Sequence, residues 1–298
     1  MRYRLLHRAQ INLSEISFGG MSLGDNHKEN ADLLQAAFDG GINYFDTADI
    51  YQNGFNEETV GKGIWPFRKH IFLATKVGNE PKSNGTGWNW NPSKSYILKA
   101  VEGSLKRLQT DYIDLYQLHG GTIEDKREEV LEAFQVLKQE GKILHYGISS
   151  IRPNVVREYV AQSSIVSDML QYSLLDRRPE ELLLKLLSEN GIGVLVRGAL
   201  AKGLLAYKDS SDYLDYTIQD VELLRDKLNS FSIEKMTNSQ VALKWVLANP
   251  AVTSVVLGIR TKAQLKDALA IHDSRNLTSD EVSQLAEILK PNFYSAHR

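Results

Sequence analysis

Four polar side chains close to strand-like segments could together form a proton-donating site. Asp46, Lys76 and His119 each stand at the end of a short apolar run, and Tyr51 lies five residues beyond Asp46. A phenol has a pKa of about 10, and a nearby ammonium makes it a better acid by stabilising the phenolate. We therefore expect Tyr51 to be the acid and Lys76 its tuning cation. Asp46 would hold Lys76 charged, and His119 would donate to a substrate oxygen.

The alternative is that each side chain has an ordinary structural role and that the four form no common site. A single tyrosine after a strand usually packs, and a single charged residue at a strand end is usually solvated. The occurrence of all four at strand ends argues against that alternative, because the carboxyl ends of successive strands are where a (β/α)₈ barrel places its chemistry.

Strand-like and helix-like segments alternate along almost the whole chain. The expected strands are residues 15–18, 42–46, 70–76, 112–118, 143–148, 165–170, 192–196 and 253–257. The expected helices are residues 31–38, 94–108, 128–138, 153–161, 179–189, 238–248 and 262–271. Eight alternating units predict an α/β fold: one TIM barrel over residues 1–298, with its active site at the carboxyl ends of the strands. No Gly-x-Gly-x-x-Gly follows a strand, which weighs against a Rossmann domain.

Three segments fall outside this alternation. Residues 2–13 are expected to form a hairpin before the first barrel strand. Residues 77–92 are expected to be an irregular loop, and loops of that length are usually functional. Residues 206–236 are acidic and rich in tyrosine, and are expected to hold one extra helix. Trp88 and Trp90 either line an aromatic substrate pocket or only pin their loop to the barrel. Further residues that could face such a pocket are Met21, Phe55 and Tyr207.

Composition sets the broad class of the protein. The chain has 298 residues, of which 42% are apolar and 24% charged, with a mean hydropathy of −0.31 and a net charge of −2. These values indicate a globular protein and give no reason to expect nucleic acid or membrane as a partner. The absence of cysteine excludes disulfides and thiolate metal sites, and there is no His-x-x-x-His pair, so no metal is expected. The start lacks the apolar core of a signal peptide, so we expect a cytoplasmic protein. We also expect a monomer or weak homo-oligomer.

Three short motifs carry a resemblance to a known family. Residues 46–51 read Asp-Thr-Ala-Asp-Ile-Tyr, residues 74–76 read Ala-Thr-Lys, and residues 116–119 read Tyr-Gln-Leu-His. They resemble strand ends of the aldo-keto reductases, and the resemblance runs from about residue 3 to residue 290. It is strongest to the bacterial and potassium-channel-β-subunit-like branch, in which Tyr-Ser-Leu-Leu-Asp-Arg, found here at residues 172–177, is common. The resemblance implies a barrel, a nicotinamide cofactor and Tyr51 as general acid.

The segment after the last strand suggests which cofactor that would be. A glycine turn before a helix offers free N–H groups to a phosphate, and an arginine adds a bidentate donor. The residues alone favour an ordinary helix start with a solvated arginine. The resemblance implies binding of the 2′-phosphate of NADPH (NADP⁺) by Gly258, Arg260, Thr261 and Gln264. It also implies cofactor contacts, including backbone contacts to the pyrophosphate from the loop after strand seven, by Gly20, Met21, Ser149, Gln171, Arg197, Ala199, Leu200, Lys202 and Gly203.

Four positions depart from the family's commonest pattern: Ser150, Met169, Arg197 and Ala268. The family commonly has asparagine where Ser150 stands, so Ser149 is expected to carry more of the contact to the nicotinamide carboxamide. It usually has glutamine where Met169 stands, and Gln171 is expected on the opposite strand face. It often has tyrosine where Arg197 stands. Ala268 replaces an asparagine that reads adenine, with Asp267 beside it.

The function expected from all of this is NADPH-dependent reduction of a small carbonyl substrate, an aldehyde or ketone, to an alcohol. A cofactor-binding redox sensor or partner subunit with little turnover is the alternative from another class. A lyase or hydrolase on the same barrel is a third, and the lack of a second carboxylate at a matched strand end speaks against it.

Overall fold

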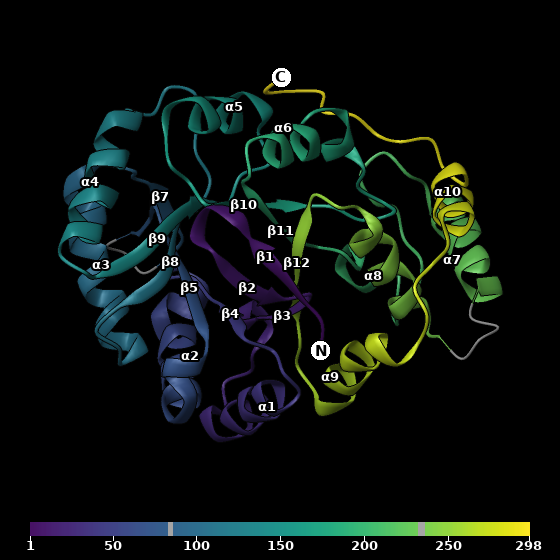
Figure 1. The fold of residues 1–298 in the computed structure, drawn as a ribbon, viewed down its shortest axis with the longest axis horizontal. Helices are drawn as coiled ribbons and strands as arrows, with labels where there is room; N and C mark the ends of the chain where they lie inside the picture. The colour runs from purple at the N-terminus through teal and green to yellow at the C-terminus, as the bar shows by residue number, and fades with distance from the viewer. Residues whose placement is uncertain (83–85, 232–235) are drawn as a thin grey trace.

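Short buried runs of apolar residues form the strands of a closed parallel barrel in the computed structural model, which describes residues 1–82, 86–231 and 236–298 (Figure 1). Within those residues eight strands close the barrel, and the last pairs with the first through Val255 and Ile16. In ring order they are β3 (Ile16–Gly19), β4 (Tyr44–Asp46), β5 (Phe72–Val77), β8 (Ile113–Leu118), β9 (Ile143–Ile148), β10 (Ser167–Gln171), β11 (Gly193–Arg197) and β12 (Val252–Gly258). The predicted (β/α)₈ barrel is therefore confirmed.

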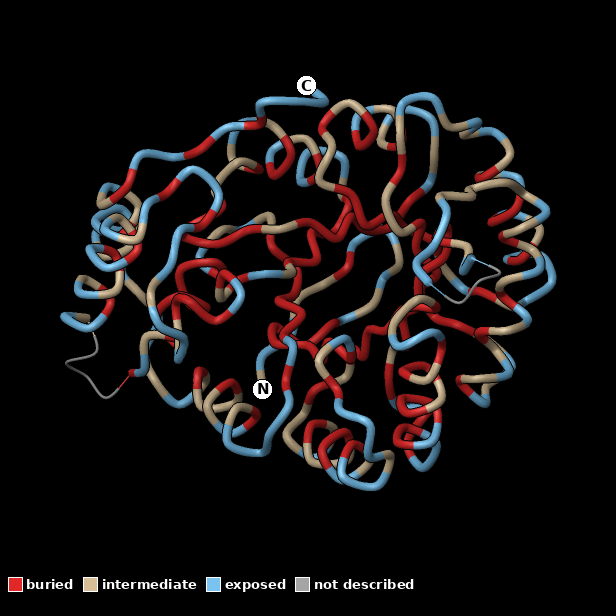
Figure 2. Tube along the Cα trace, turned by 180° about the vertical axis from the view of Figure 1, so that it is seen from behind, coloured by how far each residue is buried: buried red, intermediate tan, exposed pale blue. Residues whose placement is uncertain are grey.

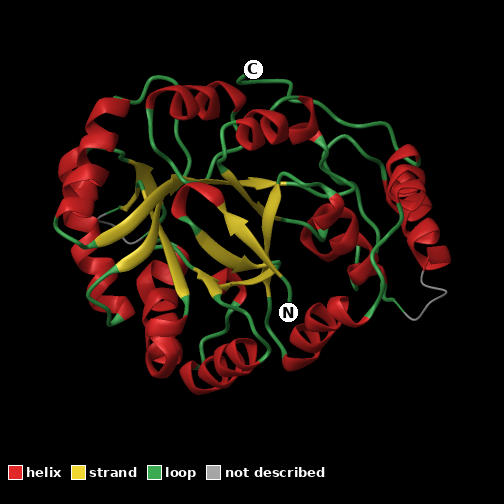
Figure 3. Ribbon diagram, in the orientation of Figure 1, coloured by secondary structure: helices red, strands yellow, loops and turns green. Residues whose placement is uncertain are grey.

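Helices surround the barrel and cover the outer face of its strands (Figure 3). They are α1 (His27–Asp39), α2 (Phe55–Ile64), α3 (Lys94–Leu108), α4 (Arg127–Gln139), α5 (Pro153–Gln162), α6 (Leu183–Glu189), α7 (Ile218–Phe231), α8 (Asn238–Ala248), α9 (Lys262–Leu269) and α10 (Ser279–Glu287). No helix in the described parts of the chain has the length and apolar character needed to cross a bilayer.

An antiparallel hairpin closes the amino-terminal end of the barrel, as expected for residues 2–13. It consists of β1 (Tyr3–Leu6) and β2 (Ile11–Ser14), with Leu6 and Leu13 buried in the core inside the barrel. A larger apolar core lies between the strands and the helices. Figure 2 shows that the buried positions follow the strands and the inner faces of the helices. The opposite end of the barrel, where the strands finish, is left for loops.

The expectation of an irregular loop over residues 77–92 was wrong. Two strands, β6 (Asn79–Pro81) and β7 (Trp88–Trp90), pair there as an antiparallel ribbon. Strands of three residues are too short to show an alternating pattern, so no periodic signal marked them. Residues 83–85 of this segment, and residues 232–235 of the expected 206–236 segment, lie outside the described residues. The extra helix of that second segment is α7.

The hydrophobic pattern of the sequence did not predict two helices, α2 and α10. Helix α2 contains two glycines, which usually lower helix propensity. Here they permit close packing, because a Cβ on Gly61 would lie 2.5 Å from the carbonyl oxygen of Leu108, and one on Gly63 would collide with Leu34. Helix α10 begins with a capping box formed by Thr278 and Glu281, a signal that was available in the sequence.

Candidate active site

Three adjacent strands and the turn after the first bring the four expected side chains together. Asp46 ends β4, Lys76 lies near the end of β5, and His119 directly follows β8. Tyr51 begins a short 3₁₀ helix, η3 (Tyr51–Gly54). The Nζ atom of Lys76 lies 5.1 Å from the centroid of the Tyr51 ring, and the His119 ring stands edge-on to that ring at 5.9 Å between centroids. The structure thus assembles the group that the sequence predicted.

A buried ion pair holds the ammonium in place. Lys76 is 1% exposed, and its Nζ donates to Asp46 Oδ1 and, at 2.7 Å, to the carbonyl oxygen of Thr47. Burial opposes the charged form of Lys76, but the carboxylate of Asp46 and then the hydroxyl of Tyr51 outweigh it, so the pKa of Lys76 is raised. The ammonium therefore keeps its charge at neutral pH.

Two side chains that the sequence reading missed complete the shell around Asp46. Gln117 Nε2 donates to Asp46 Oδ2 at 3.2 Å, and the Tyr44 hydroxyl donates to the same oxygen at 3.4 Å. Burial raises the pKa of Asp46, and its contacts with Lys76, Gln117 and Tyr44 oppose the rise. Tyr44 and Gln117 each stand two residues before a predicted site residue. Strand alternation places such residues on one face, which could have identified them.

His119 is a neutral imidazole in this site. Burial, followed by the positive charges of Lys76 and Arg197, lowers the pKa of His119 to about 3. Its Nδ1 is buried and has no hydrogen-bond partner among the described residues. A neutral ring offers one N–H donor and one lone pair. His119 can therefore donate a hydrogen bond to a substrate oxygen without bringing a second positive charge beside Lys76.

The turn after β3 is tied to the loop that carries Tyr51. A Cβ on Gly20 would lie 3.0 Å from the Asn56 Oδ1 atom and 3.0 Å from the Asp46 carbonyl oxygen. Asn56 Nδ2 donates to the carbonyl oxygen of Gly20 at 2.8 Å, and Asn56 Oδ1 accepts from the Thr47 hydroxyl at 2.6 Å. Asn56 was also missed, because it lies in the helix that the sequence did not reveal. Met21, next along the turn, is 70% exposed.

The two serines after β9 have different surroundings. The hydroxyl of Ser150 accepts from the backbone N–H of Arg152 at 3.3 Å, and the N–H of Ser150 donates to Asp168 Oδ1 at 3.1 Å. Ser149 is buried, with its N–H on the carbonyl oxygen of Leu118 at 2.8 Å. Ser150 is thus engaged in a turn, which leaves Ser149 as the better candidate for a contact with a ligand.

The expectation that Gln171 lies on the opposite face from Met169 was wrong. Strand β10 is regular from Ser167 to Gln171, and side chains two residues apart in a strand share a face. Met169 packs in the core inside the barrel, and Gln171 stands opposite Arg197 of β11 in register. Gln171 and Arg197 therefore meet at the carboxyl ends of neighbouring strands.

The loop after β11 holds several residues in left-handed backbone conformations. Ala201, Lys202 and Gly203 have φ angles of 46°, 57° and 97°, and Ala199 and Leu200 precede them. Positive φ in residues other than glycine is costly and often marks ligand-binding loops. Within the turn, the N–H of Gly203 donates to the carbonyl oxygen of Leu200 at 2.8 Å. The loop expected to bind the pyrophosphate is therefore a tight turn, and some of its backbone N–H groups already donate within the turn.

The segment after β12 begins α9 with local caps. Thr261 Oγ1 accepts from the N–H of Gln264 at 3.2 Å, and Gln264 Oε1 accepts from the N–H of Arg260 at 2.9 Å. The side chain of Arg260 is exposed. A Cβ on Gly258 would lie 2.5 Å from the Ser22 hydroxyl oxygen, so this glycine permits the close approach of two loops.

A cavity of about 440 Å³ lies between this segment and the start of α1. Its charged lining mixes both signs, with Arg260 and Lys262 facing Asp25, Glu29 and Asp32. Arg260 is thus placed at the wall of a cavity of ligand size.

Other expected residues take structural positions. Asp267 accepts from Thr237, Ser239 and Gln240, tying α9 to the start of α8, and Ala268 is buried. Trp90 Nε1 donates to Asp125 Oδ1 at 2.8 Å, which pins the β6–β7 ribbon to the loop after β8.

The remaining aromatic candidates differ in exposure. Trp88 and Tyr207 are 51% and 59% exposed, whereas Phe55 stacks on His27 at 4.3 Å between ring centroids. Trp88 therefore remains free to line a pocket, and Phe55 is partly engaged elsewhere.

Comparisons with known proteins agree with this arrangement. The model of the Aldo/keto reductase family matches residues 15–290. The "Uncharacterized oxidoreductase YqkF" of Bacillus subtilis is 47% identical over 307 residues, covering 100% of both chains. "Aldo-keto reductase yakc [NADP(+)]" of Schizosaccharomyces pombe is 33% identical, covering 78% of this chain and 76% of the relative. Among solved structures, aldo-keto reductase AKR11C1 from Bacillus halodurans in its holo form is 45% identical, covers 100% of this chain and 99% of its own, and superposes with a TM-score of 0.95.

Proposed function

The chain belongs to the aldo/keto reductase family and is an oxidoreductase of that family, and from this premise we propose that it reduces small aldehydes or ketones to alcohols with NADPH. The observation that carries the proposal is the buried Lys76–Asp46 pair lying against the ring of Tyr51. A charged ammonium that is fixed beside a phenol is what a tyrosine acid needs, because the product of proton donation is a phenolate.

NADPH is supported as the cofactor by the residues around the strand ends. At Gly20 and Gly258 a Cβ would meet neighbouring protein atoms, so both glycines allow the loops that would hold the cofactor to pack closely against one another. The exposed guanidinium of Arg260 suits a 2′-phosphate, and one relative carries NADP(+) in its name. Residues proposed to hold the cofactor are Gly20, Met21, Ser149, Gln171, Arg197, Ala199, Leu200, Lys202, Gly203, Gly258, Arg260, Thr261 and Gln264. When bound, NADPH supplies the hydride for the carbonyl carbon.

The proton comes from Tyr51. As charge develops on the carbonyl oxygen, the Tyr51 hydroxyl gives up its proton to that oxygen and becomes a phenolate. Lys76 stabilises the phenolate and does not lose its own proton, because Asp46 and the Thr47 carbonyl oxygen hold the ammonium charged. Gln117 and Tyr44 fix the carboxylate of Asp46 in turn. The chain of contacts thus orients the cation before any substrate arrives.

His119 is proposed to orient the substrate. Its neutral ring faces Tyr51 edge-on, and an N–H donor there would contact the same carbonyl oxygen that accepts the proton. A neutral donor suits this task, since a charged imidazolium would compete with Tyr51 as the acid. Two donors converging on one oxygen select carbonyl substrates over molecules without that acceptor.

A cofactor titration followed by a carbonyl screen tests the proposal. Binding of NADPH and NADH would be followed by the change in protein fluorescence, and turnover by the loss of NADPH absorbance with a panel of small aldehydes and ketones. We expect tighter binding of NADPH than NADH and turnover of at least one carbonyl class. Tight binding with negligible turnover across the panel would favour a redox sensor or partner subunit. Preference for NADH would overturn the assignment of Arg260 to the 2′-phosphate, and it would leave the proposed roles of the four catalytic side chains unaffected.

A further inference from the structure

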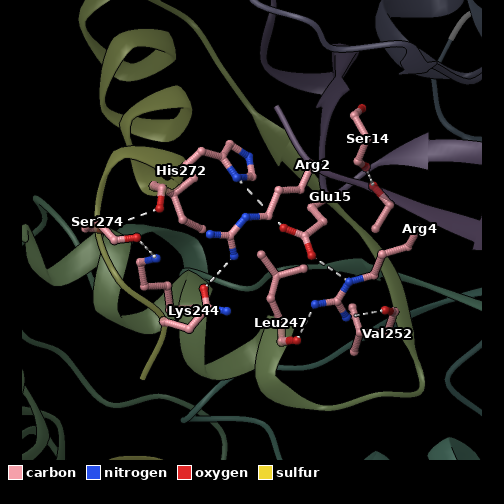
Figure 4. Close-up of polar contacts among 12 residues, drawn as sticks. Arg2, Arg4, Ser14, Glu15, Lys244, Leu247, Val252, His272 and Ser274 are labelled. Carbon is pink, nitrogen blue, oxygen red and sulfur yellow. Dashed lines mark hydrogen bonds and ion pairs between the residues drawn. The ribbon is translucent and has the colours of Figure 1, made fainter. Parts of the chain in front are cut away.

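A second cavity, of about 520 Å³, lies at the end of the barrel opposite the proposed active site. Its lining comes from Arg2 and β1, from Glu15 directly before β3, from α8, from the segment joining α9 to α10, and from α10 itself. These elements surround the amino-terminal ends of the barrel strands, whereas Asp46, Lys76 and His119 stand at the carboxyl ends. The volume is within the range of small-molecule sites. Figure 4 shows the polar side chains that meet there.

Two of the charged side chains pair with each other, and Arg4 also donates to the backbone. Arg4 Nε lies 2.7 Å from Glu15 Oε1, and the Arg4 guanidinium also donates to the carbonyl oxygens of Leu247 at 2.6 Å and Val252 at 2.8 Å. Arg4 therefore fastens the hairpin to the start of β12. Its charge and that of Glu15 compensate each other.

Two further cations line the same cavity without a carboxylate partner. Lys244 is 5% exposed, and its Nζ donates to the carbonyl oxygen of Ser274 at 3.1 Å. Arg2 Nη1 donates to Asn276 Oδ1 at 2.7 Å. Over the described ranges of the chain, no carboxylate oxygen lies within 4.0 Å of either cation. Burial, followed by repulsion from Arg2, lowers the pKa of Lys244, and the more distant carboxylate of Glu15 offsets this only in part.

An imidazole whose side chain is 11% exposed stands beside these cations. His272 Nε2 is buried and has no hydrogen-bond partner within the described residues, while its Nδ1 lies 3.9 Å from Glu15 Oε2. Buried polar atoms are normally hydrogen-bonded, so an orphaned ring nitrogen at a cavity calls for a partner. In Figure 4 the side chains of Arg2, Lys244 and His272 point toward one region. The rest of the lining is partly apolar and includes Leu247, Ile271, Leu277 and Val282.

We propose that this cavity is a binding site for a small organic anion. Its carboxylate or phosphate group would accept hydrogen bonds from Lys244, Arg2 and His272, and a compact apolar body would lie against the apolar part of the lining. Such an anion would supply a charged acceptor within hydrogen-bonding distance of Lys244, and charge-assisted hydrogen bonds of this kind are the strong ones. The site is separate from the cofactor and substrate, so it stands whether or not the proposed function holds.

Binding can be measured with three probes of similar shape. Benzoate carries a carboxylate, phenyl phosphate carries a phosphate, and benzamide is neutral. Isothermal titration of the full chain should show binding of at least one anion and none of benzamide, and the comparison of the two anions tells which group the site prefers. Lys244→Met, which keeps most of the buried stem, should weaken the binding of the preferred anion by roughly 10-fold or more. Lys185→Met, the same change at a side chain that is 79% exposed, should leave it unchanged.

Several results would overturn the site. They are no binding of either anion, equal binding of benzamide, an affinity unchanged by Lys244→Met, and loss of binding in Arg260→Ala, which would place the anion in the cofactor's phosphate position. Arg2→Gln covers the case in which Lys244→Met fails to fold, because Arg2 is exposed and its removal should also weaken the anion. An Arg2→Gln protein that folds and binds the anion as the parent does would refute the proposal by itself.

Discussion

Replacing Lys76 by methionine tests the electrostatic argument at the centre of the site. The variant removes one positive charge and keeps most of the buried stem. Taking the 5.1 Å from Nζ to the Tyr51 ring centroid as the charge separation, and an effective dielectric constant of about 20, the ammonium stabilises a phenolate by about 3 kcal/mol. That energy corresponds to roughly a 10²-fold loss in the rate of proton donation.

The assay should isolate the chemical step. Enzyme saturated with NADPH would be mixed with an excess of an aldehyde substrate, and the first turnover would be followed by the loss of NADPH absorbance. Lys185→Met serves as the matched control, since its ammonium lies 3.8 Å from Glu189 on the exposed face of α6. A Lys76→Met enzyme that keeps more than half of the parent's single-turnover rate would refute the tuning role of Lys76.

The same variant should also lower stability, because Asp46 would lose its ammonium while remaining buried. Breaking a buried ion pair by removing one partner costs about 3–5 kcal/mol. The pKa of Lys76 is raised above 10.5 in the folded protein, so this stability is fully present at neutral pH and is lost only as the pH rises through the raised value. Denaturant unfolding of both proteins at pH 7 measures the difference, and equal unfolding free energies would mean that the pair is not formed.

Three further variants probe other parts of the account. Arg260→Ala should weaken NADPH by about 10–150-fold and NADH little, because only NADPH carries the 2′-phosphate; equal weakening in a fluorescence titration would assign Arg260 another role. Gly61→Ala should destabilise the fold by about 1–3 kcal/mol in denaturant unfolding, since its Cβ would lie 2.5 Å from the backbone oxygen of Leu108; an unchanged midpoint would show that α2 can shift at no cost. His119→Gln should reduce the fall in the free energy of unfolding as the pH is lowered. The pKa of His119 is lowered from 6.5 to about 3, so its contribution is present above pH 6.5 and is lost as the pH falls toward 3, and identical curves for parent and variant would contradict that burial.

The barrel could be predicted because its strands are buried on both faces and therefore stand out as short apolar runs. The strand over residues 143–148 was expected with the bounds that the structure gives. Helix α2 was hidden because its glycines serve contacts with α1 and α3, and those contacts exist only in the folded chain. The β6–β7 ribbon was hidden because pairing, rather than periodicity, defines strands of three residues.

The four site residues could be predicted because they lie at or shortly after the ends of recognisable strands, whereas the side chains that support them depend on register. Gln117 of β8 reaches Asp46 of β4 across the intervening strand β5, and the pairing of Lys76 with Gln117 sets this contact. Strand alternation corrects the expected face of Gln171, because Gln171 and Met169 are two residues apart in β10 and therefore share a face. The charged cavity at the opposite end could not be read from the sequence at all, since Arg2 and Lys244 are more than 200 residues apart.

The single-turnover rate of Tyr51→Phe is the most direct test of the proposed acid. The change removes one hydroxyl and keeps the ring that packs against Lys76 and His119. With NADPH binding checked by fluorescence and found nearly unchanged, we expect a loss of reduction rate on the order of 10²-fold or more. A variant that binds NADPH normally and keeps half of the parent's rate would show that Tyr51 does not donate the proton.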